Sequence, residues 1–183
     1  MANLVGKFLK SKKQKLSLRF GTHHPCAETL DGYVVDIQKS HIVLCTQDDF
    51  RLDGITILPI KRIIKCRDGK FEACINKILR MNGVQKKAKV PKWLARCETI
   101  QEVLRALMKR DIWPGVEILF NKGKRSAYYL GPITDVGADQ FSIRCYDAAG
   151  RWEKTYQLGI IEIFKLNFGD HYSKVFNKFM RAV

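Results

Sequence analysis

The stretch that decides the fold is GYVVDIQKSHIVL (residues 32–44), which is followed by GITILPIKRII (residues 54–64). Apolar and β-branched side chains in both segments recur at the short period of strands, and QKS (residues 38–40) is a polar break typical of a tight turn. The pattern predicts a series of short strands. They are expected near residues 16–21, 31–38, 41–46, 55–60 and 62–66.

The same pattern recurs about 100 residues later along the chain. KLSLRF (15–20) aligns with GVEILF (115–120), and GYVVD (32–36) aligns with GPITD (131–135). Helical spacing of apolar residues predicts helices that flank each series of strands. They are expected at residues 2–10, 71–80, 99–109 and 172–181. Thr99 and Glu102 fit a capping box, which places the start of the third helix.

The repeat predicts two similar units joined by a basic segment. The expected boundaries are residues 1–82 for the first helix–barrel–helix unit, 83–98 for the linker and 99–183 for the second unit. The linker is polar and is broken by Gly83 and Pro91, and its Trp93 and Leu94 are candidates to pack on one unit. We expect each unit to form its own sheet, with no uninterrupted sheet that spans both.

The first copy resembles the two-part Sm motif as bacterial Sm-like RNA chaperones carry it. Gly32 matches the motif glycine, and the matching apolar positions are Val34, Ile37, Ile42 and Leu44. The resemblance implies a mainly β, α+β fold of two tandem Sm-like or SH3-like small barrels. Gln38 stands where the motif usually has Asp, and Ile42 where eukaryotic relatives have Asn, so their base-recognising residues are not reproduced.

The second copy matches the motif only in outline. The tandem arrangement is also similar to uncharacterised bacterial proteins in which such a barrel ends in a Gly-x-Tyr-like element and a short helix, here Gly169-Asp-His-Tyr172. This resemblance implies a fold with no activity attached, because small barrels serve unrelated functions.

The charge of the chain favours a polyanionic partner. The 33 Lys and Arg residues exceed the 18 Asp and Glu residues, which gives a formal net charge of +15. Such an excess attracts nucleic-acid phosphates, although a basic surface can also serve solubility alone. No apolar run is long enough to span a bilayer, and the Lys-rich start lacks the apolar stretch of a signal peptide. We therefore expect a cytosolic protein with no membrane partner.

The residues that carry catalytic or metal chemistry elsewhere have simpler explanations here. His23-His24-Pro25-Cys26 has no second group at ligand spacing, so a metal or nucleophilic role is disfavoured. Asp48 and Asp49 lie in a predicted turn, where Asp is favoured by local hydrogen bonding, and Asp147 begins a corresponding turn. The six cysteines lack a C-x-x-C pair and are expected to be reduced core thiols. We expect no enzyme activity, no metal and no cofactor.

Basic residues beside aromatic ones are the remaining functional feature of the sequence. Basic residues recur at positions 10–15, at 86–92 beside a Trp, and at 122–125 before a pair of Tyr residues. Single-stranded nucleic acids are bound by this mixture, with cations on the phosphates and rings on the bases. The predicted nucleic-acid site comprises Lys86, Lys87, Lys89, Lys92, Trp93, Lys122, Lys124, Arg125 and Tyr128.

The sequence thus favours a non-enzymatic basic module that binds RNA or single-stranded DNA. The alternative is a protein–protein interaction or assembly module, including self-association, that uses the edge strands of the barrels. Against the first hypothesis, a strand Tyr is as often a packing residue, and a Lys-rich loop is usually only solvated.

Overall fold

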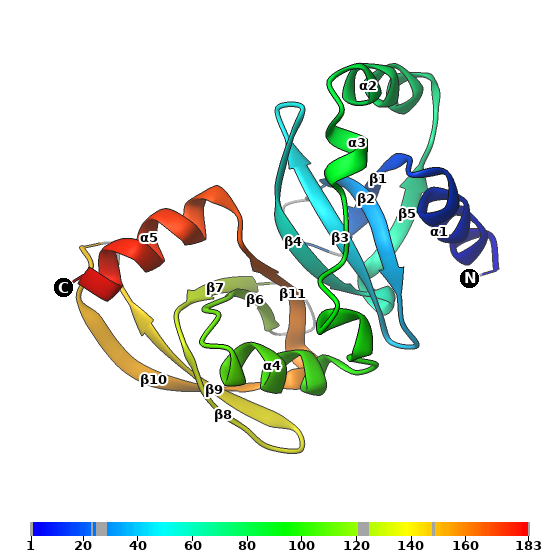
Figure 1. Ribbon diagram of the computed structural model, residues 1–183. Coiled ribbons are helices and arrows are strands. Elements are labelled where there is room, and N and C mark those ends of the chain that lie inside the picture. Colours follow the sequence, from blue (N-terminus) through cyan, green and yellow to red (C-terminus); the bar gives the residue numbers. More distant parts are fainter. Residues whose placement is uncertain (1, 23, 25–28, 121–124, 148, 183) are drawn as a thin grey trace.

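The first half of the chain alternates short strands with flanking helices. The structure is a computed structural model that describes residues 2–22, 24, 29–120, 125–147 and 149–182. The elements of the first half are α1 (Ala2–Gln14), β1 (Ser17–Thr22), β2 (Thr29–Ile37), β3 (His41–Asp48), β4 (Arg51–Pro59), η1 (Ile60–Arg62), β5 (Ile63–Arg67) and α2 (Lys70–Met81) (Figure 1). The predicted strands and helices of this half are confirmed, with ends displaced by a few residues.

The second half has a similar order of elements, with one strand more than the first. Its elements are α4 (Ile100–Lys109), β6 (Gly115–Phe120), β7 (Arg125–Leu130), β8 (Ile133–Val136), β9 (Gln140–Tyr146), β10 (Trp152–Gly159), η4 (Ile160–Glu162), β11 (Ile163–Phe168) and α5 (His171–Ala182). β7 and β8 stand where the first half has β2. Gly131, at φ +153°, and Pro132 separate them, and proline cannot donate to a sheet ladder.

The strands form an eight-stranded and a three-stranded antiparallel sheet, so the fold is α+β. The larger sheet has the order β5-β1-β2-β3-β4-β11-β6-β7, and the smaller has the order β10-β9-β8. β4 and β11 join the two halves, with Ile57 opposite Leu166 and Ile55 opposite Phe168. The prediction that no sheet would span both copies is therefore wrong. Period-2 patterns specify which face of a strand is buried, but they do not specify which strand pairs with it.

One hydrophobic core is shared by both halves. Val43 and Ile57 of the first half pack in the same cluster as Ile118 and Leu166 of the second half and Leu104 of α4. A separate cluster lies beneath α1 and is built from Phe8, Leu18, Phe20, Ile42 and Leu44, among others. β3 contributes to both clusters because it is covered on both faces. This explains its continuous apolar run, since a strand buried on both faces has no polar side.

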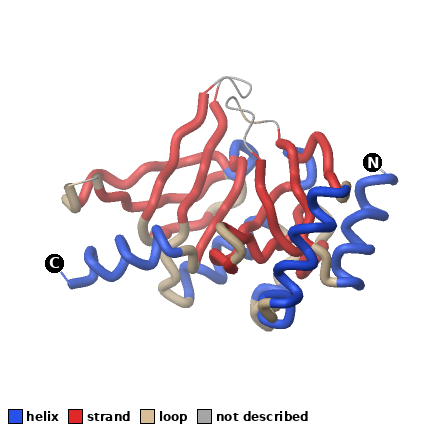
Figure 2. Tube along the Cα trace, turned by 90° about the horizontal axis from the view of Figure 1, so that it is seen from above, coloured by secondary structure: helices blue, strands red, loops and turns tan. Residues whose placement is uncertain are grey.

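The segment between the halves packs against the strands of the first half and against the shared core. It contains the short helix α3 (Val84–Lys87) and the 3-10 turn η2 (Leu94–Arg96). Ala88 is buried beside Cys45 and Leu79, and Leu94 is fully buried in the shared core. The prediction that Trp93 and Leu94 could pack on a unit is confirmed. The two ends of the chain lie at opposite ends of the molecule (Figure 2).

The described cysteines are free thiols, and most are buried. Cys45, Cys66, Cys97 and Cys145 are buried, whereas Cys74 is exposed on α2. Burial raises the pKa of the Cys45 thiol to about 11 and that of Cys66 to about 12, so both are protonated and unreactive at neutral pH. Among the described residues, no helix is long and apolar enough to cross a membrane.

Candidate nucleic-acid interface

The predicted lysines of the linker lie near those that end α1. Lys86 and Lys87 are exposed on α3, and Lys89 and Lys92 are exposed in the irregular stretch that follows. Gln85 Nε2 donates to the carbonyl oxygens of Gln14 (3.1 Å) and Lys15 (2.7 Å) and thereby holds α3 against the end of α1. The lysine run at the end of α1 and the one on α3, which are far apart in sequence, thus converge on one side of the first half.

Trp93 packs between parts of the second half. Its ring centroid lies 5.7 Å from that of Phe168, and the guanidinium of Arg110 lies 4.8 Å above it. The ring is half-buried, and both contacts fasten the linker to the second half. Trp93 is therefore engaged with the second half and is not a free stacking surface beside the converging lysines.

The described hairpin residues of the predicted site lie on β7, in the second half. Arg125 is exposed at the start of β7, and Tyr128 lies three residues further along that strand. Its hydroxyl lies 3.2 Å from Asn167 Nδ2, and burial raises the pKa of the phenol to about 12. Lys122 and Lys124 lie outside the described residues.

The second half carries a row of aromatic side chains in mutual contact, which we call the aromatic row: Trp113, Trp152, Tyr146 and Phe176. The centroids of Trp113 and Trp152 are 5.7 Å apart, those of Trp152 and Tyr146 are 5.9 Å apart, and those of Tyr146 and Phe176 are 6.1 Å apart. Trp152 is 37% exposed. The rings come from the segment after α4, from β9 and β10, and from α5.

A guanidinium group lies over each ring of the tryptophan pair. The Arg181 guanidinium lies 4.2 Å from the Trp113 ring, and that of Arg144 lies 4.5 Å from the Trp152 ring. Lys174 and Lys178 of α5 join Trp113 and Arg181 in lining a hollow of about 410 Å³. Rings and fixed positive charges therefore share one surface.

A hydrogen-bond network fixes the aromatic row. Asn177 accepts from the Tyr146 hydroxyl (3.0 Å) and donates to the Trp113 carbonyl (3.0 Å). Asp111 accepts from Trp113 Nε1 (2.6 Å) and from Arg181 Nη1 (2.6 Å), and these bonds hold its pKa below the usual value. The rings are thus preorganised, which lowers the entropy cost of binding.

Sequence reasoning missed the aromatic row because its members are scattered from position 113 to position 176. Each lies alone among unlike neighbours, and only the pairing of β9 with β10 and the packing of α5 bring them together. The spacing of the cations on α5 was visible in the sequence. Lys174, Lys178 and Arg181 recur at helical spacing, which places them near one another on the helix surface.

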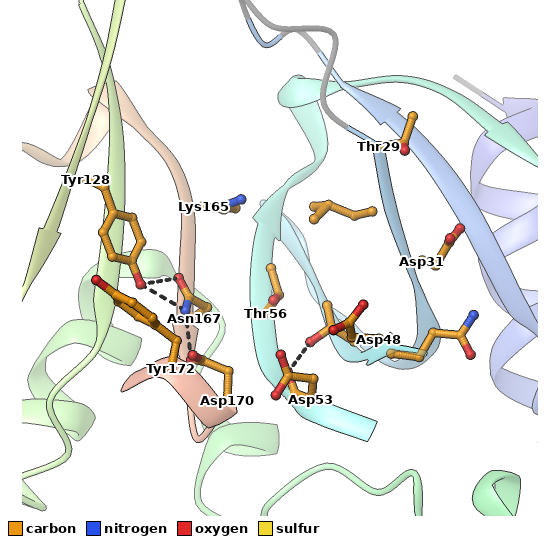
Figure 3. A pocket seen from close by; sticks show the side chains of 13 residues that line it. Thr29, Asp31, Asp48, Asp53, Thr56, Tyr128, Lys165, Asn167, Asp170 and Tyr172 are labelled. Atoms are coloured by element: carbon orange, nitrogen blue, oxygen red, sulfur yellow. Dashed lines mark hydrogen bonds between the residues drawn. The ribbon is translucent and has the colours of Figure 1, made fainter. Parts of the chain in front are cut away.

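A second hollow lies between the halves and encloses about 390 Å³ (Figure 3). Tyr128, Asn167 and Tyr172 line it from the second half, and Asp48 and Asp53 line it from the first half. We call it the interdomain cleft. Gly115 makes room for Tyr128, since a β-carbon there would collide with the phenol.

The other sequence motifs have structural roles. Asp147 Oδ1 accepts from the backbone nitrogens of Ala149 and Arg151, which confirms turn chemistry at that position. His24 Nε2 lies 2.6 Å from Glu117 Oε1, and Lys165 Nζ lies 3.2 Å from Glu117 Oε2. His23, Pro25 and Cys26 lie outside the described residues. Within the described part of the chain, no three His, Cys, Asp or Glu side chains are grouped to hold a metal ion.

Comparisons with known proteins add no relative to these observations. No family model, no curated protein and no solved structure matches the chain.

Proposed function

We propose that the chain is a cytosolic, non-enzymatic protein that binds single-stranded RNA or DNA on the aromatic row and its flanking cations. The observation that carries this proposal is the contact between Trp113 and Trp152, with Arg181 and Arg144 placed over their rings. Bases stack on such rings irrespective of sequence, while cations neutralise phosphates. The net charge of +15 would speed the encounter with a polyanion.

The predicted lysines of α3 enter this proposal as a second phosphate-binding surface. Among the described residues, Lys86, Lys87 and Lys15 have no carboxylate partner, so their charges are free to meet phosphates. Because Trp93 packs on the second half, we expect this proposed surface to bind phosphates of the nucleic-acid strand without stacking its bases.

The test is fluorescence polarisation with mixed-sequence RNA and DNA oligonucleotides over a range of salt concentrations. Trp152→Ala should weaken binding by about 1 to 3 kcal/mol and leave the salt dependence unchanged, because it removes stacking without removing charge. The double variant Lys174→Gln/Lys178→Gln should flatten the log–log salt slope by about 1.4, at roughly 0.7 per phosphate contact.

Two matched variants locate the interface. Phe71→Ala removes another ring that lies under a guanidinium, that of Arg19 at 5.1 Å, but in the first half, and it should leave affinity unchanged. The double variant Lys86→Gln/Lys87→Gln shows how much the α3 lysines contribute to the log–log salt slope. Absence of binding at low salt by the folded wild-type protein would refute the proposal, and equal effects of Trp152→Ala and Phe71→Ala would refute the placement.

We further propose that each half is a small barrel of the Sm-like or SH3-like kind and that the two arose as a tandem repeat. The support is the order helix, strands, 3-10 turn, strand, helix, which occurs in both halves. η1 at Ile60–Arg62 and η4 at Ile160–Glu162 lie at corresponding positions.

Assembly through edge strands is the second candidate function. β4 of the first half pairs with β11, the last strand of the second half. In the order of elements, β10 corresponds to β4 and β5 corresponds to β11, and both β10 and β5 lie at sheet edges. A second copy of the chain could therefore add its β5 to β10. Light scattering at high salt should then detect oligomers that grow with concentration, and a monomer at every concentration would exclude this candidate.

A further inference from the structure

The interdomain cleft has two walls of different chemistry. Tyr128 and Tyr172 stand on the side of the second half, whereas Asp48 and Asp53 stand on the side of the first half (Figure 3). The two residues are 44% and 56% exposed, respectively. A ligand in the cleft would therefore meet aromatic surface on one side and carboxylates on the other.

The four aspartates that line the cleft differ in how many of their carboxylate oxygens already accept hydrogen bonds. Asp31 accepts two hydrogen bonds from the Arg19 guanidinium (2.6 and 2.8 Å). Asp170 caps α5 and accepts from Ser173 and Asn167. Burial raises the pKa of Asp170, but these hydrogen bonds outweigh it and hold the pKa below the usual value. The carboxylates of these two residues are thus engaged by hydrogen bonds within the protein.

Asp48 and Asp53 retain acceptor capacity toward the cleft. Asp53 uses Oδ1 to accept from the backbone nitrogen of His171 (2.7 Å). The Asp48 carboxylate has no hydrogen bond or ion pair with any described residue. The positive charge in the lining is that of Lys165, which lies 3.2 Å from Glu117. A local excess of negative charge therefore remains in a protein whose net charge is strongly positive.

The faces of the two cleft rings are free of the cation contacts that other rings of the described chain make. Lys and Arg side chains lie over six other rings of the described chain: Phe71, Trp93, Trp113, Trp152, Tyr156 and Phe164. None of these contacts involves Tyr128 or Tyr172. The two rings of the cleft thus keep faces that no cation of the described chain occupies.

We propose that the interdomain cleft binds an alkylammonium group, with its charge against Asp48 and Asp53 and its hydrocarbon stem on Tyr172 and Tyr128. Carboxylates satisfy the ammonium hydrogens, and the electron-rich faces of the rings attract the same cation. The group can come from a free polyamine or from a lysine side chain of a partner. Both sources present the same chemistry to the cleft.

The test uses spermidine and a capped lysine as probes of the full-length protein, measured by isothermal titration calorimetry. Because the net charge repels cations in general, saturable 1:1 binding requires a local site. Asp48→Asn should weaken binding about five-fold, and Tyr172→Ala about three-fold. Asp48 and Tyr172 are both exposed, so these variants should fold.

Control variants separate the cleft from other surfaces. Asp135→Asn removes an exposed carboxylate of β8 and should leave binding unchanged. Trp152→Ala should also leave it unchanged, so failure of the nucleic-acid proposal can be recognised independently. Tighter binding of spermidine identifies a free polyamine as the source, and equal binding of the capped lysine identifies a side chain.

Three results would overturn the proposal. One is the lack of saturable binding of either probe up to about 10 mM, a concentration that would reveal even weak sites. Another is an equal loss of binding in Asp135→Asn and Asp48→Asn, which would reveal a diffuse charge effect. The third is unchanged binding in Tyr172→Ala together with full competition by Mg²⁺, which would reveal a simple carboxylate site.

Discussion

His41 shows how one buried side chain can make the stability of this fold depend on pH. It is fully buried at the start of β3, and its Nδ1 lies 3.2 Å from the Ser40 hydroxyl. Its Nε2 has no hydrogen-bond partner among the described residues. Burial lowers the pKa of His41 to about 4, against the smaller opposing effects of Asp36 and Glu102, so the folded protein keeps the ring neutral.

We predict that the free energy of unfolding falls as the pH is lowered from 7 to 5. Below about pH 6.5 the unfolded chain binds a proton at His41 that the folded chain does not, which costs up to about 1.4 kcal/mol per pH unit. Urea unfolding at several pH values measures the slope. His41→Leu should remove this contribution whatever its effect on absolute stability. An equal slope in both proteins would show that other groups cause the dependence.

At the scale of elements, the contact between β4 and the start of α5 depends on Gly54. This residue has φ +81°, and a β-carbon there would lie 2.5 Å from the Asp170 nitrogen and 2.7 Å from the Phe168 carbonyl oxygen. Asp53 is bonded to His171 at the same place. The first half thus approaches the backbone of the second half more closely than any side chain would permit.

Gly54→Ala should therefore destabilise the protein by about 3 kcal/mol, through left-handed strain and through the clash between backbones. Gly83→Ala is the matched control, since Gly83 also has a left-handed φ, +66°, but nothing lies within 4 Å of a β-carbon there. It should cost only about 1 kcal/mol. Thermal and denaturant unfolding compare the two, and similar losses would mean that the halves separate easily at this contact.

The elements were predictable from the sequence to the extent that their causes are local. The capping box at Thr99 is present, with Glu102 Oε2 accepting from the Thr99 nitrogen (3.2 Å) and Thr99 Oγ1 accepting from the Glu102 nitrogen (3.2 Å). The division of one strand at Pro132 was not predicted, although Gly131-Pro132 carried the signal. The pairing of β4 with β11 and the aromatic row depend on long-range packing, which leaves no pattern in any short stretch.

At the scale of the whole molecule, we predict that the two halves unfold together. They share the core around Val43, Ile57 and Leu166 as well as the sheet, so neither can lose its structure without exposing the other. The three tryptophans, at positions 93, 113 and 152, report on the linker and the second half, whereas circular dichroism reports on both halves.

The measurement is urea unfolding followed by both probes. Coincident transitions are expected for one cooperative unit. A circular-dichroism transition in two steps, with only one of them seen by fluorescence, would show instead that the first half is an independent domain.

The pairing of β4 with β11 also determines how late in synthesis of the chain the two halves can join. β4 ends at Pro59, but its partner begins only at Ile163, so the ribosome must add roughly 100 residues before the pair can close. At about 5 to 20 residues per second, the nascent first half waits some 5 to 20 seconds with one edge open. During that time Ile55 and Ile57 lie on an open strand edge that any neighbouring polypeptide can pair with. Crowded polysomes are therefore where this protein is most exposed to aggregation.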